Sequence, residues 1–163
     1  MKNKGRTEVI VVLDNIRSTH NVGSIFRTAD ALGVKQLVLC GTTPAPIDRF
    51  GRERKDIAKV SLGGEKSVLW KYEKDSLSIV RKFKKEGYQI IAVEQALKSV
   101  DYKKVKLNSN SKIVFVMGEE VLGINKNILK IADVIAEIPM LGEKESLNVS
   151  VSFGVALFRI LNI

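Results

Sequence analysis

The sequence predicts an α/β domain in which helices flank a mostly parallel sheet. Apolar runs of strand length, rich in β-branched residues, alternate with segments whose apolar residues recur at helical spacing. The chain has 163 residues, of which 45% are hydrophobic, and this is enough to bury one core. We therefore expect a single domain over residues 1–163.

The first forty residues predict a strand, a helix and a second strand. Val9 to Leu13 is a continuous apolar run that ends at an Asp-Asn pair, as expected for a strand buried on both faces. Helical spacing from Val22 to Leu32, followed by Gly33, predicts the helix and its end. Gln36 to Cys40 is the next strand, so the unit is a right-handed crossover by default.

The rest of the chain continues the alternation after a long interruption. Gly41 to Gly64 holds two of the three prolines and few aliphatic residues, which predicts a long loop. Helical spacing returns from Ser67 to Glu86, and a polar connection is expected from Leu97 to Asn110. The remaining patterns predict strands at Tyr88–Val93, Lys112–Met117 and Val134–Ile138, and helices at Asn125–Ile131 and Asn148–Leu161.

Charge and cysteine content restrict the functional classes. The 27 Lys and Arg residues exceed the 18 acidic residues by 9, which favours nucleic acid as a partner, with solubility alone as the alternative. A single Cys and a single His cannot supply a four-ligand zinc site, so no metal is expected. No apolar stretch is long enough to cross a membrane and no signal peptide is recognisable, so a cytoplasmic protein without a membrane partner is expected.

Three common catalytic motifs are absent from the sequence. The first strand is not followed by G-x-G-x-x-G, and Leu62 to Ser67 lacks the spacing of a phosphate-binding loop. A Ser-His-Asp triad would have to use His20, and no G-x-S-x-G elbow presents a nucleophile. These absences disfavour ordinary dinucleotide-binding enzymes and hydrolases.

Polar and glycine-rich residues are concentrated in three segments, each directly after a predicted strand. The segment from Asn15 to Asp30 contains N-V-G-x-I-x-R-T-A-D, and the segment from Met117 to Ile124 contains G-x-E-x-x-G. The third, from Ile138 to Ser152, contains I-P-M-x-G and then S-L-N-V-S-V-S. Open α/β sheets bind ligands at the carboxyl ends of their strands, so these segments predict one site.

With these motifs in this order and spacing, the sequence from Val9 to Phe158 resembles the SpoU-type (TrmH-like) RNA ribose 2'-O-methyltransferases of the SPOUT superfamily. The resemblance implies S-adenosylmethionine as methyl donor, a homodimer and a C-terminal trefoil knot. It also implies methyl transfer to a ribose 2'-hydroxyl of structured RNA. Transfer RNA is favoured over ribosomal RNA, because 163 residues leave no room for the N-terminal RNA-binding domain of many relatives that act on rRNA.

The resemblance also implies roles for individual residues. The catalytic residues would be Arg27, Asn21, Glu120 and Asn148. From the residues alone, Arg27 could be a solvated helix residue, Asn21 and Asn148 could be helix caps, and Glu120 could occupy an exposed turn. The methyl donor would be held around Val93, Gly118, Ile138, Met140, Ser146 and Leu147.

The long predicted loop carries a cluster of cations, namely Arg49, Arg52, Arg54, Lys55 and Lys59. We expect them to contact RNA phosphates, as flexible basic loops do, with solvated surface as the alternative. Two other functions stay open, a non-catalytic RNA-binding protein on the same fold and a small-molecule methyltransferase. The presence of Arg27, Glu120 and Asn148 argues against the first, and the net charge of +9 argues against the second.

Overall fold

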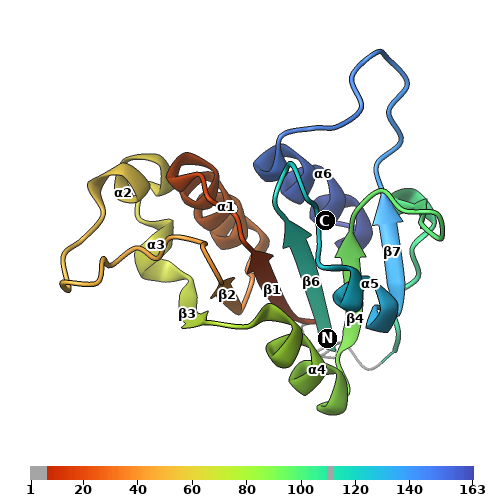
Figure 1. The fold of residues 1–163 in the computed structure, drawn as a ribbon, viewed down its shortest axis with the longest axis horizontal. Coiled ribbons are helices and arrows are strands. Elements are labelled where there is room, and N and C mark those ends of the chain that lie inside the picture. The colour runs from red at the N-terminus through yellow and green to blue at the C-terminus, as the bar shows by residue number, and fades with distance from the viewer. Residues whose placement is uncertain (1–6, 110–111) are drawn as a thin grey trace, which may run out of the picture.

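A parallel sheet forms the centre of the fold (Figure 1). The computed structural model describes residues 7–109 and 112–163. Within these residues the sheet has seven strands in the order β3-β2-β1-β6-β4-β7-β5, and all neighbouring strands are parallel. The strands are β1 (Glu8–Asp14), β2 (Gln36–Cys40), β3 (Leu69–Glu73), β4 (Gln89–Val93), β5 (Val100–Asp101), β6 (Lys112–Gly118) and β7 (Val134–Glu137).

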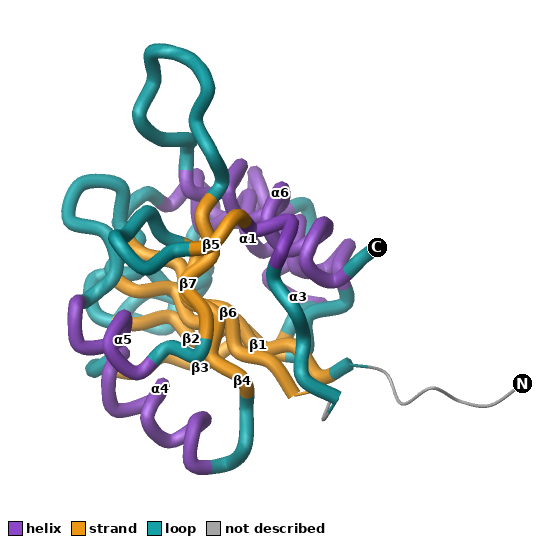
Figure 2. The backbone as a smooth tube through the Cα atoms, turned by 90° about the vertical axis from the view of Figure 1, so that its right-hand side faces the viewer, coloured by secondary structure: helices purple, strands orange, loops and turns teal. Residues whose placement is uncertain are grey.

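Helices cover both faces of this sheet. They are α1 (Thr19–Leu32), α2 (Lys55–Ser61), α3 (Gly64–Ser67), α4 (Ser76–Lys85), α5 (Lys126–Ile131) and α6 (Val149–Leu161), with a short 3₁₀ helix η1 (Tyr102–Lys104). Figure 2 shows α1 and α6 on one side of the strands, and α4 and α5 on the other. The α/β architecture with a mostly parallel sheet is therefore confirmed.

Alternate residues of the central strand serve the two faces. Val11 and Leu13 of β1 belong to the core under α1 and α6, whereas Ile10 and Val12 belong to the core under α4 and α5. The continuous apolar run in the sequence reflects this burial on both faces. Cys40, at the end of β2, is completely buried, and burial is the main cause that raises the pKa of its thiol to about 12. Its role is packing rather than nucleophilic chemistry.

The predicted loop from Gly41 to Gly64 is only partly a loop, because it contains α2. Of the residues in this helix only Ile57 and Ser61 are buried, so no apolar repeat marks it in the sequence. Its stability comes from contact with α1, where a side chain at Gly23 would lie 2.9 Å from both the Ile57 carbonyl oxygen and Val60 Cβ. Tertiary packing has thus produced a helix that local pattern does not show.

The predicted helix from Ser67 to Glu86 is also wrong in its first third. Leu69 to Glu73 forms β3 at one edge of the sheet, and α4 begins only at Ser76, after Asp75 caps it by accepting from the Leu77 amide. Leu69 and Tyr72 are 65% and 50% exposed, so the strand lacks the apolar run of a buried one. The polar connection from Leu97 to Asn110 likewise contains the two-residue edge strand β5 and η1.

The other predicted elements are confirmed within a few residues. α1 starts at Thr19, and Gly33 ends it in the left-handed conformation with φ of 66°. Asn148 precedes α6 and caps it, since its side chain accepts from the Ser150 amide. None of the helices in the described part of the chain is long and apolar enough to span a membrane.

Candidate active site

The three segments singled out in the sequence meet at the carboxyl edge of the sheet. β1 and β6 are neighbours, and their last residues, Asp14 and Gly118, are paired in register. The first two segments therefore leave the sheet side by side, as expected for parallel strands. The third follows β7 and runs through Asn148 into the first turn of α6. The structure thus brings Asn21, Glu120 and Asn148 together, as the next contacts show.

Asn21 is the residue that joins the three segments. Its side-chain nitrogen Nδ2 donates to Glu120 Oε1 at 2.6 Å, and its oxygen Oδ1 accepts from Asn148 Nδ2 at 3.0 Å. The residue is 6% exposed, so this amide is a buried connection rather than a surface contact. Asn21 is not the cap of α1, because the Ser18 hydroxyl accepts from the Asn21 main-chain amide. Its side chain is free to hold the segments together.

The direction of the hydrogen bonds in this network is fixed at Ser150. The Ser150 main-chain amide and hydroxyl both donate to Asn148 Oδ1, at 2.9 and 2.6 Å. With its oxygen accepting, Asn148 must donate through nitrogen, and the same holds for Asn21. Glu120 is therefore the acceptor at the end of a one-directional chain of hydrogen bonds. Asn148 therefore caps α6 and takes part in this network at the same time.

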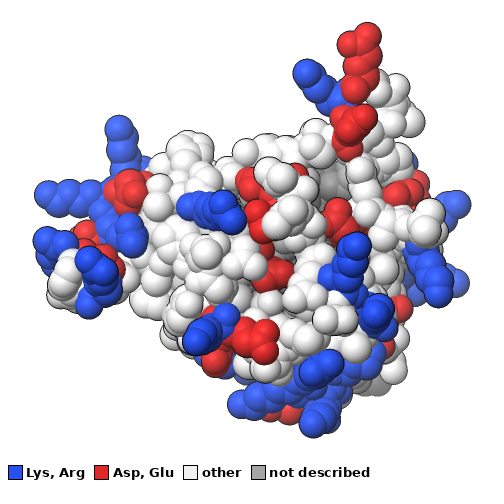
Figure 3. Space-filling view, viewed as in Figure 1, with Lys and Arg blue, Asp and Glu red and all other residues white. Residues whose placement is uncertain are grey.

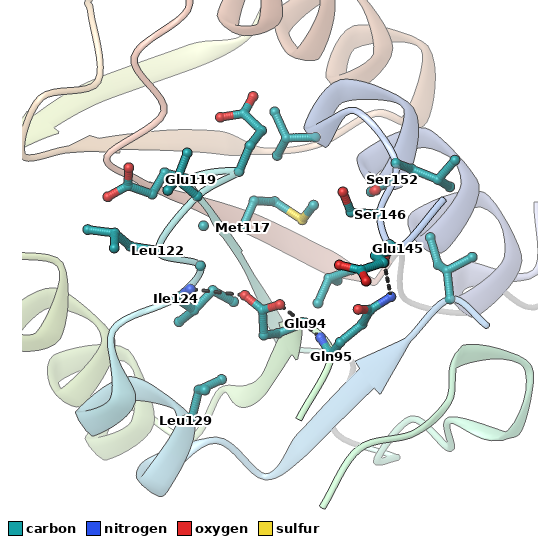
Figure 4. A pocket seen from close by; sticks show the side chains of 18 of the residues that line it. Glu94, Gln95, Met117, Glu119, Leu122, Ile124, Leu129, Glu145, Ser146 and Ser152 are labelled. Atoms are coloured by element: carbon teal, nitrogen blue, oxygen red, sulfur yellow. Dashed lines mark hydrogen bonds between the residues drawn. The ribbon is translucent and has the colours of Figure 1, made fainter. Parts of the chain in front are cut away.

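A cavity of about 470 Å³ lies beside the network (Figure 4). Glu120 lines it, so the hydrogen-bond chain ends in its wall. Six further lining residues are those that the sequence predicts around the methyl donor, namely Val93, Gly118, Ile138, Met140, Ser146 and Leu147. They come from the ends of β4, β6 and β7 and from the segment before α6. The cavity volume lies in the range of about 300–1,000 Å³ usual for small-molecule sites.

The cavity is acidic, a feature that the sequence reasoning missed. Glu94, Glu119, Glu120 and Glu145 line it, and Lys126 is the one cation among its described lining residues. Figure 3 shows acidic side chains near the centre of the face that is turned toward the viewer. Such a lining favours a cationic ligand over an anionic one. Glu94 directly follows β4, so the rule applied to the other strand ends would have found it.

Glu94 also ties the walls of the cavity together (Figure 4). Its two carboxylate oxygens accept from the main-chain amides of Ile124 and Gln95, at 3.0 and 2.9 Å. The Gln95 side chain in turn donates to the Glu145 carbonyl oxygen at 2.9 Å. The end of β4 is thereby connected to the segment after β6 and to the segment before α6.

Two glycines allow the segment after β6 to fold back on itself. A side chain at Gly118 would place Cβ 2.5 Å from the Ile124 nitrogen. Because this nitrogen belongs to the backbone, the contact cannot be relieved by moving a flexible side chain. Gly123 has φ of 69°, and a side chain there would press on the Glu94 carboxylate. These contacts explain why glycine stands at both ends of the G-x-x-x-x-G pattern around Glu119 and Glu120.

Arg27 lies apart from this network within the chain. It is exposed on α1, it does not line the cavity, and it has no hydrogen bond or ion pair with any residue in the ranges 7–109 and 112–163. The structure therefore places three of the four predicted catalytic residues together and leaves Arg27 facing outward. An exposed guanidinium is available to a phosphate or to a second chain.

The predicted RNA-contacting cations divide between a loop and a helix. Arg49 and Arg52 are exposed on the loop before α2, and their guanidinium carbons lie 4.7 and 5.0 Å from the centre of the Phe50 ring. Lys55 and Lys59 are exposed on α2 itself. Arg54 is half-buried, and its buried Nε has no hydrogen-bond partner in the described part of the chain.

Asp48 gives this loop a defined shape. Its carboxylate accepts from the amides of Phe50 and Arg52 at 2.8 and 2.9 Å, and from Arg52 Nε at 2.9 Å. The bond from the Arg52 amide is the largest of the causes that hold the pKa of Asp48 below its usual value. The carboxylate thus remains ionised at neutral pH, and its hydrogen bonds hold the turn of the loop that carries Arg49 and Arg52.

Comparisons with known proteins agree with the fold and with the family that the sequence resembles. The model of the SpoU rRNA Methylase family matches residues 8–158. A tRNA (guanosine(18)-2'-O)-methyltransferase of Aquifex aeolicus is 32% identical over 156 residues, covering 96% of this chain and 70% of that protein. A 23S rRNA (guanosine-2'-O-)-methyltransferase, RlmB of Neisseria meningitidis serogroup B, is 31% identical, covering 96% of this chain and 59% of that protein.

A solved structure gives the same result. The crystal structure of an AdoMet-bound rRNA methyltransferase from Sinorhizobium meliloti superposes with a TM-score of 0.85 at 28% identity. The match covers 96% of this chain and 57% of that one. The chain thus spans between about half and three quarters of the length of these similar proteins.

Proposed function

This chain belongs to the SpoU rRNA methylase family, and we propose that it transfers a methyl group from S-adenosylmethionine to a ribose 2'-hydroxyl of structured RNA. One observation carries the proposal. Asn21 connects Glu120 and Asn148 in the wall of a cavity lined by all six residues predicted to surround the methyl donor. This contact supports a role for Glu120 in activating the hydroxyl beside a site for the donor.

The cavity fits S-adenosylmethionine in size and in charge. The donor carries a sulfonium and an ammonium group against a single carboxylate, and four glutamates line the cavity. Main-chain groups at Val93, Gly118, Ile138, Met140 and Leu147, with the Ser146 hydroxyl, would hold its adenosine and polar atoms. When bound, it supplies an electrophilic methyl group.

The chain's own residues must then activate the 2'-hydroxyl, which loses its proton as it attacks. Arg27 cannot readily accept that proton, because a guanidinium group is already protonated at neutral pH. Arg27 instead grips the adjacent phosphate and stabilises negative charge that develops on the 2'-oxygen. Glu120, oriented by Asn21, accepts the proton.

RNA would be held in part by the basic loop before α2. Arg49, Arg52 and Arg54, with Lys55 and Lys59 on α2, supply cations for phosphate contacts. We propose tRNA as the substrate, the class of RNA on which the similar Aquifex enzyme acts by its name. An rRNA substrate is the alternative. A single domain over residues 1–163 and a location in the cytoplasm are part of the same proposal.

A homodimer would complete the site. Val151, Val155 and Phe158 share one face of α6 and are 49%, 39% and 37% exposed. α6 packs beside α1, which carries the outward-facing Arg27. We propose that a second copy covers this face, so that residues of both chains form each active site. The C-terminal trefoil knot that the family resemblance implies is part of the same proposal.

The experiment that tests the function maps 2'-O-methyl groups in RNA from cells with and without the gene. The proposal expects one tRNA nucleotide to lose its 2'-O-methyl group in the deletion strain and to regain it with the wild-type gene. Complementation with Arg27→Ala should fail. Loss of a methyl group from rRNA alone would select the alternative substrate. Unchanged methylation in both RNAs would overturn the proposal.

A further inference from the structure

A second concave surface, outside the candidate active site, lies at the β5 edge of the sheet. It is a groove of about 810 Å³ between β7, the end of α5 and residues 96–106. Aliphatic side chains, including Leu97, Val100 and Ile135, line part of it. Lys98, Lys104, Lys106 and Lys130 line the rest, and we call it the lysine groove.

The cations of the lysine groove are not neutralised within the chain. Asp133 is the one carboxylate among its described lining residues, and it is already engaged. Its Oδ1 lies 2.9 Å from Lys84 Nζ, and its Oδ2 accepts from the Ile90 amide at 2.8 Å. None of the four lysines forms an ion pair with a residue in the described ranges. The groove therefore carries an excess of positive charge.

The lysine groove adjoins the candidate methyl-donor cavity. Leu129 lines both of them, and Ala96 of the groove follows Glu94 and Gln95 of the cavity along the chain. Figure 3 shows basic side chains at the right of the same face that carries the acidic centre. The basic loop before α2 lies at the opposite end of the molecule in Figure 1. Cations thus flank the acidic site on two sides.

We propose that the lysine groove binds the sugar-phosphate backbone of the substrate RNA, at nucleotides away from the one that is methylated. The inference rests on the proposed function and adds a second contact surface to it. RNA that reaches an acidic cavity meets repulsion at its phosphates, so cations beside the cavity are needed to hold it there.

The composition of the lysine groove favours backbone contact over base reading. Its cations are lysines, which bind phosphate as point charges. Neither arginine nor an aromatic side chain is found among its described lining residues, and these are the groups that stack on unpaired bases. Such a groove contributes affinity that is independent of sequence and dependent on salt.

The test compares two variants from which three positive charges are removed. The groove variant combines Lys98→Ala, Lys104→Ala and Lys106→Ala. The control combines Arg81→Ala, Lys82→Ala and Lys85→Ala, which are exposed on α4 and line neither concave surface. Binding of full-length tRNA is measured at several salt concentrations, and S-adenosylmethionine binding by calorimetry. Thermal melting establishes that both variants are folded.

The groove variant should bind tRNA more weakly, and the slope of log affinity against log salt should fall by about 0.7 to 0.9 for each phosphate that the variant no longer binds. Methyl-donor affinity should stay unchanged, and the control variant should keep the wild-type slope. An unchanged slope in the groove variant, or an equal fall in the control, would overturn the inference while leaving the proposed function standing. Failure of the wild-type protein to bind tRNA or rRNA would instead overturn the proposed function.

Discussion

The Asn21 side-chain nitrogen donates to Glu120 Oε1 at 2.6 Å, although 99 residues separate the two in the sequence. Asn21 therefore fixes where the Glu120 carboxylate stands relative to the cavity. Asn21 Oδ1 accepts from Asn148, so a change at Asn21 affects its contacts with both of the other segments.

Replacing Asn21 tests this relationship. In Asn21→Asp the donor is lost, and two carboxylates face each other at hydrogen-bond distance. Like charges so close cannot both remain ionised without cost, so one of them takes up a proton near neutral pH. We expect the single-turnover rate to fall by about 10²-fold or more, the usual contribution of a positioned proton acceptor.

The double variant Asn21→Asp/Glu120→Gln is the matched control. The new amide at position 120 can donate to the new carboxylate at position 21, which can still accept from Asn148. Both hydrogen bonds are then restored, the first with donor and acceptor exchanged. If Glu120 accepts the proton, thermal stability and methyl-donor affinity recover while the rate stays low. Recovery of the rate as well would show that Glu120 acts through position alone.

A change at Gly118 should disturb the cavity without touching a charged group. The Cβ of Gly118→Ala would lie 2.5 Å from the Ile124 nitrogen and 2.6 Å from the Gly123 carbonyl carbon. Displacing this backbone should cost about 1–3 kcal/mol, as overpacking usually does. If this free energy is added to the conformation that binds S-adenosylmethionine, the affinity for the donor, measured by calorimetry, falls roughly tenfold or more.

Gly142→Ala provides the comparison for this variant. Gly142 also lies in a segment near the cavity, but a side chain there meets no atom within 4 Å. Its methyl-donor affinity and melting temperature should match those of the wild type. Equal losses in both variants would indicate a general sensitivity of the loops and would contradict the close contact assigned to Gly118.

Substitutions of Arg27 distinguish charge stabilisation from proton abstraction. Arg27→Lys keeps the positive charge but loses the planar fork, so it should retain measurable single-turnover activity. Arg27→Ala should lose far more, with methyl-donor affinity intact because Arg27 does not line the cavity. Complete and equal loss in both variants would favour an arginine that accepts the proton and would reject the role proposed here.

The exposed face of α6 tests the proposed dimer. Val155 is 39% exposed between Val151 and Phe158, and Val155→Asp would place a charge in the proposed interface. Sedimentation should show a wild-type dimer at micromolar concentration and a monomeric, inactive variant. The control Leu69→Asp changes an exposed aliphatic residue on β3 and should remain dimeric. A wild-type monomer with full activity at this concentration would contradict the dimer.

Burial explains which elements could be predicted from the sequence. β1, β2, β4 and β6 are largely buried, so their apolar runs stand out. β3 and β5 lie at the two edges of the sheet, where exposed and half-buried residues mix and no run forms. α2 is short and buries little of its own surface, so its contact with α1 cannot be read locally.

For the candidate site, too, some features could be predicted from the sequence and others could not. The family resemblance implied six of the residues that line the cavity, and they lie together because parallel strands deliver their ends to one edge. The contact between Asn21 and Glu120 joins positions far apart in sequence, and no local pattern specifies it. Glu94 was overlooked because it belongs to none of the three motifs, although it bonds to the Ile124 and Gln95 amides.

The most direct measurement of the central claim is methyl transfer by the purified protein. Isotope-labelled S-adenosylmethionine is incubated with the protein and with tRNA or rRNA from a strain that lacks the gene, and the RNA is digested to nucleosides. We predict labelled 2'-O-methylnucleoside with the wild type and none with Arg27→Ala. Label on a base, or no label in either RNA from a protein that binds the methyl donor, would contradict the account.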